Sequence, residues 1–269
     1  MTKEPLQKRE LKRVLVTGAT GAIGKSIARL IAEQDNTMVT IVARNKAKAQ
    51  KTVEELVQTS GNAKISYRIC DLSSKEDIRL LAQGWDLPLH VLINDAGVTP
   101  RRREETPDGI EMQWATNVLG YFWMMKYFTP ILEKYGPSRV VNVASYWAGN
   151  LDLNDPEFKR RHYHNDTAYR QSKQADRMLS AAFARKLEEK GISVNACHPG
   201  DVRSTLASNL GYGGHETPDQ GAQTPVWVAT SQELEGVTGK YFEHMRESHC
   251  SFGSNLEMSE QLYGICDSY

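Results

Sequence analysis

The sequence predicts a single α/β domain, in which helices cover both faces of a doubly wound parallel sheet of about seven strands. Short runs of β-branched residues alternate with longer amphipathic segments, which is typical of βαβ units. Several runs are apolar throughout, as expected for parallel strands buried on both sides. The 269 residues contain no repeat, low-complexity tract or linker-like stretch, so we expect one domain spanning 1–269.

Seven runs are expected to form the strands, and the last of them is shorter than the others. They are Val14–Thr17, Val39–Ala43, Ile65–Cys70, Val91–Asn94, Val140–Ala144, Ser193–Ala196 and Gly239–Phe242. The segments between them show the spacing of apolar residues that indicates helices. The expected helices are Ile23–Gln34, Ala47–Thr59, Lys75–Gly84, Gly109–Lys134, Asp166–Lys190 and Asp219–Ser231.

Two irregular stretches interrupt this alternation, and residues 1–12 precede it as an N-terminal extension. Residues 146–165 carry extra polar and aromatic side chains, and residues 204–218 are rich in glycine. Both begin near the end of a predicted strand, and ligands of open α/β sheets bind outside the carboxyl ends of the strands. We therefore expect both stretches to contact a substrate, with 204–218 as a mobile substrate loop.

Charge and composition limit the partners that the protein can have. Lysine plus arginine (33) balances aspartate plus glutamate (33), which leaves no extended electrostatic footprint for nucleic acid. The first residues are charged, and no apolar run approaches the roughly 20 residues that cross a bilayer. The four cysteines lack metal-ligand spacing, which favours reduced thiols. These features predict a cytoplasmic protein with no nucleic-acid partner, no membrane anchor and no metal site.

A glycine-rich turn joins the first predicted strand to the first predicted helix. It runs from Gly18 to Gly24 with the sequence GATGAIG. Glycines let the backbone turn tightly and approach a pyrophosphate, and the helix that follows offers free N–H groups and the positive end of its dipole. In this strand–turn–helix context the turn predicts a dinucleotide site of the Rossmann type.

The end of the second predicted strand indicates which dinucleotide is bound. NAD enzymes usually place an acidic residue there for the ribose hydroxyls, whereas this chain has Arg44 and Asn45. A guanidinium suits a 2′-phosphate by charge and forked geometry. A solvated arginine at the start of a helix is the alternative interpretation. NADP(H) is therefore the preferred cofactor, and NAD(H) is the alternative.

Tyr169 and Lys173 form a YxxxK pattern early in a predicted helix. Positions i and i+4 share one helix face, so the two side chains project together. A phenol with a pKa near 10 is a poor acid–base catalyst at neutral pH. A neighbouring ammonium, together with an oxidised nicotinamide, stabilises the phenolate and lowers that pKa. The pair thus predicts a proton-transferring tyrosine.

Further motifs follow the glycine loop in order along the chain, each near the carboxyl end of a predicted strand or within a helix. They are Asn94-Asp95-Ala96-Gly97, Asn117, Ser145 and Pro199-Gly200. With them the chain resembles the short-chain dehydrogenases/reductases of the single-domain branch, and it is most similar to the retinol dehydrogenase-like group. The segments 221–225 and 236–242 carry that closer resemblance, as does the separation of 24 positions between Ser145 and Tyr169.

The resemblance implies a role for each matching residue. Tyr169 is expected to be the general acid or base, Lys173 to hold the nicotinamide ribose, and Ser145 to bind the substrate oxygen. Asn117 is expected in a distorted part of its helix, holding a water that links Lys173 to solvent. The expected cofactor-binding residues are Gly18, Thr20, Gly21, Ile23, Gly24, Arg44, Asn45, Asp71, Leu72, Asn94, Ala96, Gly97, Tyr169, Lys173, Pro199, Gly200, Val202 and Ser204.

Three positions depart from the usual pattern of the family. Ala22 stands where a glycine is common and Gly21 precedes it, so the conformation of the loop is open. Asp95 replaces the commoner second asparagine. Ser204 stands where a threonine often contacts the cofactor amide, and serine keeps the hydroxyl.

The predicted reaction is hydride transfer between NADP(H) and a small-molecule carbonyl or alcohol substrate, which the resemblance suggests is lipophilic. Trp147 is a candidate wall of the substrate cavity. One alternative is reduction of an activated C=C bond or a specialised biosynthetic ketone, and another is an NADP(H)-binding regulatory protein without turnover. The family often pairs subunits through the helix that holds Tyr169, so a homodimer is one expected state.

Overall fold

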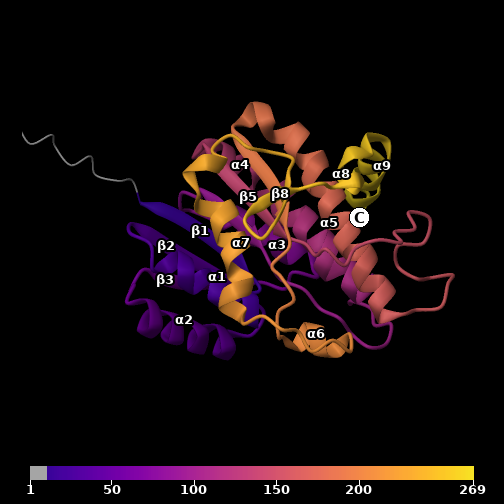
Figure 1. The fold of residues 1–269 in the computed structure, drawn as a ribbon, viewed down its shortest axis with the longest axis horizontal. Coiled ribbons are helices and arrows are strands. Elements are labelled where there is room, and N and C mark those ends of the chain that lie inside the picture. The colour runs from indigo at the N-terminus through magenta and orange to yellow at the C-terminus, as the bar shows by residue number, and fades with distance from the viewer. Residues whose placement is uncertain (1–10) are drawn as a thin grey trace, which may run out of the picture.

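The computed structural model describes residues 11–269, and residues 1–10 of the expected N-terminal extension lie outside the described residues. The described chain forms one α/β domain (Figure 1). Its strands are β1 (Lys12–Thr17), β2 (Thr37–Ala43), β3 (Ile65–Ile69), β4 (Val91–Asn94), β5 (Ser138–Val143), β6 (Ile192–Cys197), β7 (Tyr241–Glu243) and β8 (Arg246–Ser248).

Nine α-helices cover this sheet within residues 11–269, together with three shorter helical segments. The α-helices are α1 (Ala22–Ala32), α2 (Lys46–Ser60), α3 (Lys75–Gln83), α4 (Gly120–Lys134), α5 (Asn165–Leu187), α6 (Thr205–Asn209), α7 (Pro218–Thr230), α8 (Ser251–Ser254) and α9 (Leu256–Asp267). The segments are the π-helix η1 (Trp114–Leu119) and the 3₁₀ turns η2 (Glu188–Lys190) and η3 (Gln232–Leu234).

The strands lie in the order β3-β2-β1-β4-β5-β6-β7-β8. All neighbours pair in parallel except β7 and β8, which form an antiparallel hairpin. The order reverses between β1 and β4, and this switch point opens a crevice at the carboxyl ends of the strands. The predicted doubly wound sheet is therefore confirmed, with eight strands in place of about seven.

Two apolar layers hold the helices against the sheet. Leu15 belongs to the layer shared with α4, α5 and α9, whereas Val14 and Val16 belong to the layer under α1 and α7. Successive strand residues point to opposite faces, so one short run supplies both layers. In Figure 1, α1 and α7 lie together across one face of the sheet.

Some elements differ from the expectation. The helix predicted over Gly109–Lys134 begins only around Met112, and it passes through the π segment before α4. β8 was not predicted because Arg246-Glu247-Ser248 has no apolar run, and its residues are largely exposed at the edge of the sheet. Helices α8 and α9 were not predicted either.

The terminal helices cover part of the surface of α5. Both α8 and α9 pack against α5 (Figure 1), and Leu262 and Cys266 of α9 are fully buried there. The homodimer expected to form through the helix that holds Tyr169 stays a prediction. No helix within residues 11–269 combines the length and the apolar character needed to cross a bilayer.

Candidate active site

The glycine loop between β1 and α1 is packed too tightly for larger residues. Gly18 has φ of +72°, and a Cβ atom there would lie 2.7 Å from the backbone nitrogen of Ala96. A Cβ on Gly24 would lie 2.6 Å from the carbonyl oxygen of Gly18. Gly21 is the N-cap of α1 and has no side chain to satisfy the first amides. The loop therefore leaves free N–H groups at a helix N-terminus, where a phosphate binds well.

A cavity of about 470 Å³ runs from this loop along the carboxyl edge of the sheet. It passes from the ends of β2 and β3 to the face of α5 that carries Tyr169 and Lys173. Its size and its glycine cradle fit an extended dinucleotide. The predicted cofactor residues that line it are Gly18, Thr20, Gly21, Ile23, Arg44, Asp71, Leu72, Ala96, Gly97, Tyr169, Lys173, Pro199 and Ser204.

Five predicted cofactor residues lie outside this lining, and three of them have other places in the structure. The side chain of Asn45 accepts a hydrogen bond from the Lys48 amide at 2.9 Å and so caps α2. Asn94 donates to the side chain of Asn142 at 2.9 Å, inside the sheet. Gly24 ends the loop in the first turn of α1, packed against the Gly18 carbonyl. Cofactor contact by these three residues stays a prediction, as it does for Gly200 and Val202, which line a second cavity.

Three of the four predicted catalytic residues lie where the two cavities meet. Tyr169 lines both cavities, Ser145 lines the second and Lys173 lines the first. Burial raises the pKa of Tyr169 above its ordinary value, although Lys173 and a hydrogen bond with Ser145 act in the opposite direction. The phenol is therefore protonated at neutral pH, and the lower pKa expected beside an oxidised nicotinamide stays a prediction.

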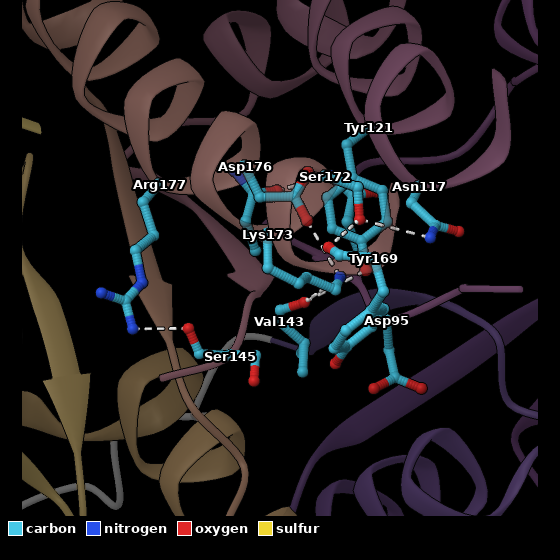
Figure 2. Close-up of polar contacts among 12 residues, drawn as sticks. Asp95, Asn117, Tyr121, Val143, Ser145, Tyr169, Ser172, Lys173, Asp176 and Arg177 are labelled. Atoms are coloured by element: carbon cyan, nitrogen blue, oxygen red, sulfur yellow. Dashed lines mark hydrogen bonds and ion pairs between the residues drawn. The ribbon is translucent and has the colours of Figure 1, made fainter. Parts of the chain in front are cut away.

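Lys173 has two fixed acceptors behind the site (Figure 2). Its Nζ atom donates to the carbonyl oxygen of Val143 at 2.9 Å and to Asp176 Oδ2 at 2.9 Å. The ammonium lies 5.0 Å from the ring centre of Tyr121 and 5.9 Å from that of Tyr169. Burial disfavours its charge, but Asp176 and Tyr169 outweigh that effect and raise the pKa of Lys173.

Asn117 lies in the π segment, as the resemblance suggested. Its amide group pairs with the backbone of Val98, accepting from the N–H at 2.8 Å and donating to the carbonyl at 3.0 Å. It also donates to the hydroxyl of Ser172 at 3.4 Å. These contacts tie the loop after β4 to α5, and the expected water between Asn117 and Lys173 stays a prediction.

The second cavity, of about 120 Å³, lies beside Ser145 and is bounded by aromatic and aliphatic side chains. Trp147 belongs to its lining, as anticipated, and packs edge to face on Tyr212 at 5.8 Å between ring centres. Asp166 accepts hydrogen bonds from Trp147 Nε1 at 2.9 Å and from the hydroxyl of Tyr212 at 3.3 Å. This joins the 204–218 stretch, which includes α6, to the start of α5.

Four residues of the site were not assigned a role from the sequence. Lys48, in the first turn of α2, lines the first cavity together with Arg44. Asp95 and Asp176 both influence Lys173, and Tyr121 lies under its ammonium. The available signal was charge: Asp176 is a carboxylate three residues after the lysine on the same helix, and positions i and i+3 are neighbours. Across residues 11–269, no group of three His, Cys, Asp or Glu side chains could hold a metal ion.

Comparison with known proteins assigns the class. A family model described as short chain dehydrogenase matches residues 12–212, so the chain belongs to the short-chain dehydrogenase family. It is an oxidoreductase that acts on CH–OH or C=O groups with a nicotinamide cofactor, and the resemblance noted from the sequence is confirmed.

Two human relatives are retinol dehydrogenases. The chain is 33% identical to retinol dehydrogenase 11 over 95% of this chain and 85% of the relative, and 31% identical to retinol dehydrogenase 13 over 88% and 77%. A probable oxidoreductase of Streptomyces antibioticus is 34% identical over 88% of this chain and 86% of its own.

Solved structures show the same fold. An uncharacterized protein from Mycobacterium paratuberculosis aligns with a TM-score of 0.82 at 24% identity, covering 98% of this chain and 95% of its own. The Pseudomonas aeruginosa RhlG/NADP active-site complex aligns with a TM-score of 0.69 at 24% identity, covering 89% and 97%.

Proposed function

We propose that this protein reduces an apolar carbonyl compound with NADPH. The observation that carries the proposal is the position of Tyr169, a buried and protonated phenol at the junction of the two cavities. A proton donor beside the place where a substrate oxygen binds suits carbonyl reduction, because the developing alkoxide needs a proton.

The first cavity supports the choice of NADPH. Arg44 and Lys48 line its end beside β2, where no carboxylate follows the strand. Two cations suit the additional 2′-phosphate of NADPH. The RhlG/NADP complex and a structure of an actinorhodin polyketide ketoreductase with NADPH share this fold, which supports the same choice.

The second cavity supports an apolar substrate. Its walls include Trp147, Tyr212, Leu206 and Leu210, and apolar walls with a few polar groups at one end are typical of small-molecule sites. The relatives named retinol dehydrogenases support a lipophilic carbonyl. Its polar lining residues include His198, Asp201 and Ser204 as well as Ser145 and Tyr169, and the last two orient the substrate oxygen.

The positions of these residues give each of them a role in the proposed reaction. A bound nicotinamide supplies the hydride. Ser145 donates a hydrogen bond to the substrate oxygen as negative charge develops there, and the hydroxyl of Tyr169 delivers the proton. Lys173 holds positive charge behind the phenol, and the aromatic walls exclude water from the reacting carbon.

The test is NADPH oxidation, followed by absorbance, against a panel of aliphatic and aromatic ketones and aldehydes. Tyr169→Phe keeps the ring and removes the donor, so we expect turnover to fall by roughly 10²- to 10⁴-fold, the usual range for a general acid. Wild-type activity on activated C=C bonds alone would favour the alternative reductase. NADPH binding with no turnover on any compound would favour the regulatory alternative. Unchanged turnover in Tyr169→Phe would contradict the role of the phenol.

A further inference from the structure

Lys173 and Asp176 form an ion pair that is removed from water. Their side chains are 4% and 0% exposed, and Nζ lies 2.9 Å from Asp176 Oδ2. Figure 2 shows Asp176 beside Lys173 on α5, and Lys173 lines the first cavity whereas Asp176 does not. The second carboxylate oxygen, Oδ1, has no hydrogen-bond partner.

Burial alone would discharge this lysine. A fully buried ammonium without a counter-charge loses its proton readily, and documented cases have a pKa of about 5–6. An uncharged Lys173 could neither stabilise a phenolate at Tyr169 nor attract an anionic dinucleotide. The site therefore needs an anion close to Nζ.

Within residues 11–269, Asp176 is the one group facing the ammonium of Lys173 that is an anion at pH 7. Burial raises the pKa of Asp95, which follows β4, to about 8, and that carboxyl is neutral at pH 7. Burial raises the pKa of Asp176 only to about 6, because Lys173 offsets part of the effect. Burial also raises the pKa of the remaining groups that face the pair, which are Tyr169 on α5, Tyr121 on α4, Cys197 on β6 and Cys266 on α9.

We propose that Asp176 is a positioning residue that keeps the ammonium of Lys173 charged and directs its remaining N–H toward the first cavity. Asp176 and the Val143 carbonyl hold two of the three ammonium protons. The third is left for the side of the lysine that lines the cavity. The inference rests on the proposed function only in assigning NADPH to that cavity.

The first test measures NADPH binding by fluorescence between pH 5.5 and 9.5 in wild type, Asp176→Asn and Asp176→Glu. At pH 5.5, just below the pKa of about 6 that burial gives Asp176, most of the wild-type carboxyl is protonated, so the ratio of Asp176→Asn to wild-type Kd is at its smallest. As pH rises, the unpaired Lys173 of the variant loses its proton. We expect the ratio to grow at least tenfold by pH 9.5, and the ratio for Asp176→Glu to stay flat.

The effects of other titrating groups on the Kd cancel in these ratios, because those groups, Asp95 among them, are the same in wild type and in every variant. Glu260→Gln is the matched control. Glu260 of α9 pairs at 2.7 Å with Lys186, a lysine of α5 that, unlike Lys173, is exposed. The ratio for Glu260→Gln stays near one at every pH. A ratio for Asp176→Asn that does not change with pH overturns the proposal.

The second test uses urea unfolding of the protein without nucleotide at pH 8. Removing one member of a buried ion pair leaves an uncompensated charge, whereas removing both does not. We expect Lys173→Met to lower the unfolding midpoint more than the double variant Lys173→Met/Asp176→Asn does. Equal or additive losses overturn the proposal.

The two tests separate this inference from the proposed function. Neither needs a carbonyl substrate, so a protein that reduces no tested compound still tests Asp176. Should Asp176→Asn not fold, Lys173→Met and the double variant decide the matter.

Discussion

The carboxyl group of Asp95 lies directly beneath Gly24, and a Cβ on Gly24 would come within 2.7 Å of Asp95 Oδ2. This places an acid under the loop that would hold the cofactor pyrophosphate. Burial raises the pKa of Asp95 to about 8, although Lys173 and the Gly24 amide lower it in part. The acid is neutral at pH 7 and becomes an anion as pH rises past 8.

We therefore expect NADPH to bind more weakly as pH rises from 7 to 9.5, because an ionised Asp95 repels the diphosphate. Folding stability falls as pH rises from about 4 to about 8, where the folded state keeps the Asp95 proton that the unfolded chain has lost, and the Asp95 contribution levels off above pH 8. Asp95→Asn, which restores the commoner residue of the family, removes the Asp95 contribution to both trends. Fluorescence titration and thermal unfolding measure them, and equal slopes in variant and wild type would contradict this account.

Arg44 and Lys48 are expected to decide between NADPH and NADH. A hydrogen bond to a charged group contributes roughly 1.5–3 kcal/mol, and each ~1.4 kcal/mol is tenfold in affinity. Arg44→Ala should raise the Kd for NADPH about 10- to 100-fold and leave that for NADH within about threefold. Lys48→Ala should act in the same direction with a smaller effect.

Lys46→Ala is the matched control for cofactor preference. Lys46 is an exposed lysine in the first turn of the same helix, and it is not part of the cavity lining. Equal losses for NADPH and NADH in Arg44→Ala would show that Arg44 does not bind the 2′-phosphate.

Asp166 is expected to set the shape of the substrate cavity without touching the cofactor. Its carboxylate joins Trp147 to Tyr212, so Asp166→Ala frees both rings. Because the contact with Tyr212 is partly exposed, we expect a rise of roughly 3- to 10-fold in KM for the carbonyl substrate, with an unchanged NADPH Kd. Asp152→Ala is the control. Asp152 lies in the irregular residues 146–165, where its carboxylate accepts a hydrogen bond from the Asn154 amide, and the KM of this variant should match wild type.

Local patterns account for what could be predicted from the sequence. The glycine loop, the YxxxK pair and Ser145 depend on strand–turn–helix order and on i, i+4 spacing, which the chain carries within a few residues. The partners of Lys173 do not follow from spacing alone, because i+3 places Asp176 beside it but says nothing of burial. Nearly every residue of α5 between Ala168 and Ala184 is buried, since α8 and α9 cover its outer side, and neither helix was predicted.

Leucine-to-alanine substitutions at a buried and an exposed position of α9 test whether this helix covers α5. Leu262 is fully buried, and the ring of the adjacent Tyr263 packs 5.0 Å from Phe122 and 5.1 Å from Phe183 between ring centres. Replacing a buried leucine by alanine costs about 2–5 kcal/mol, so Leu262→Ala should lower the free energy of unfolding by about that amount. Leu256→Ala is the control, because Leu256 is the first residue of α9 and its side chain is 57% exposed. Surface substitutions of this kind change the free energy of unfolding by no more than about 0.5 kcal/mol. Urea unfolding of both variants measures the difference, and a stable Leu262→Ala would mean that α9 does not pack on α5 in solution.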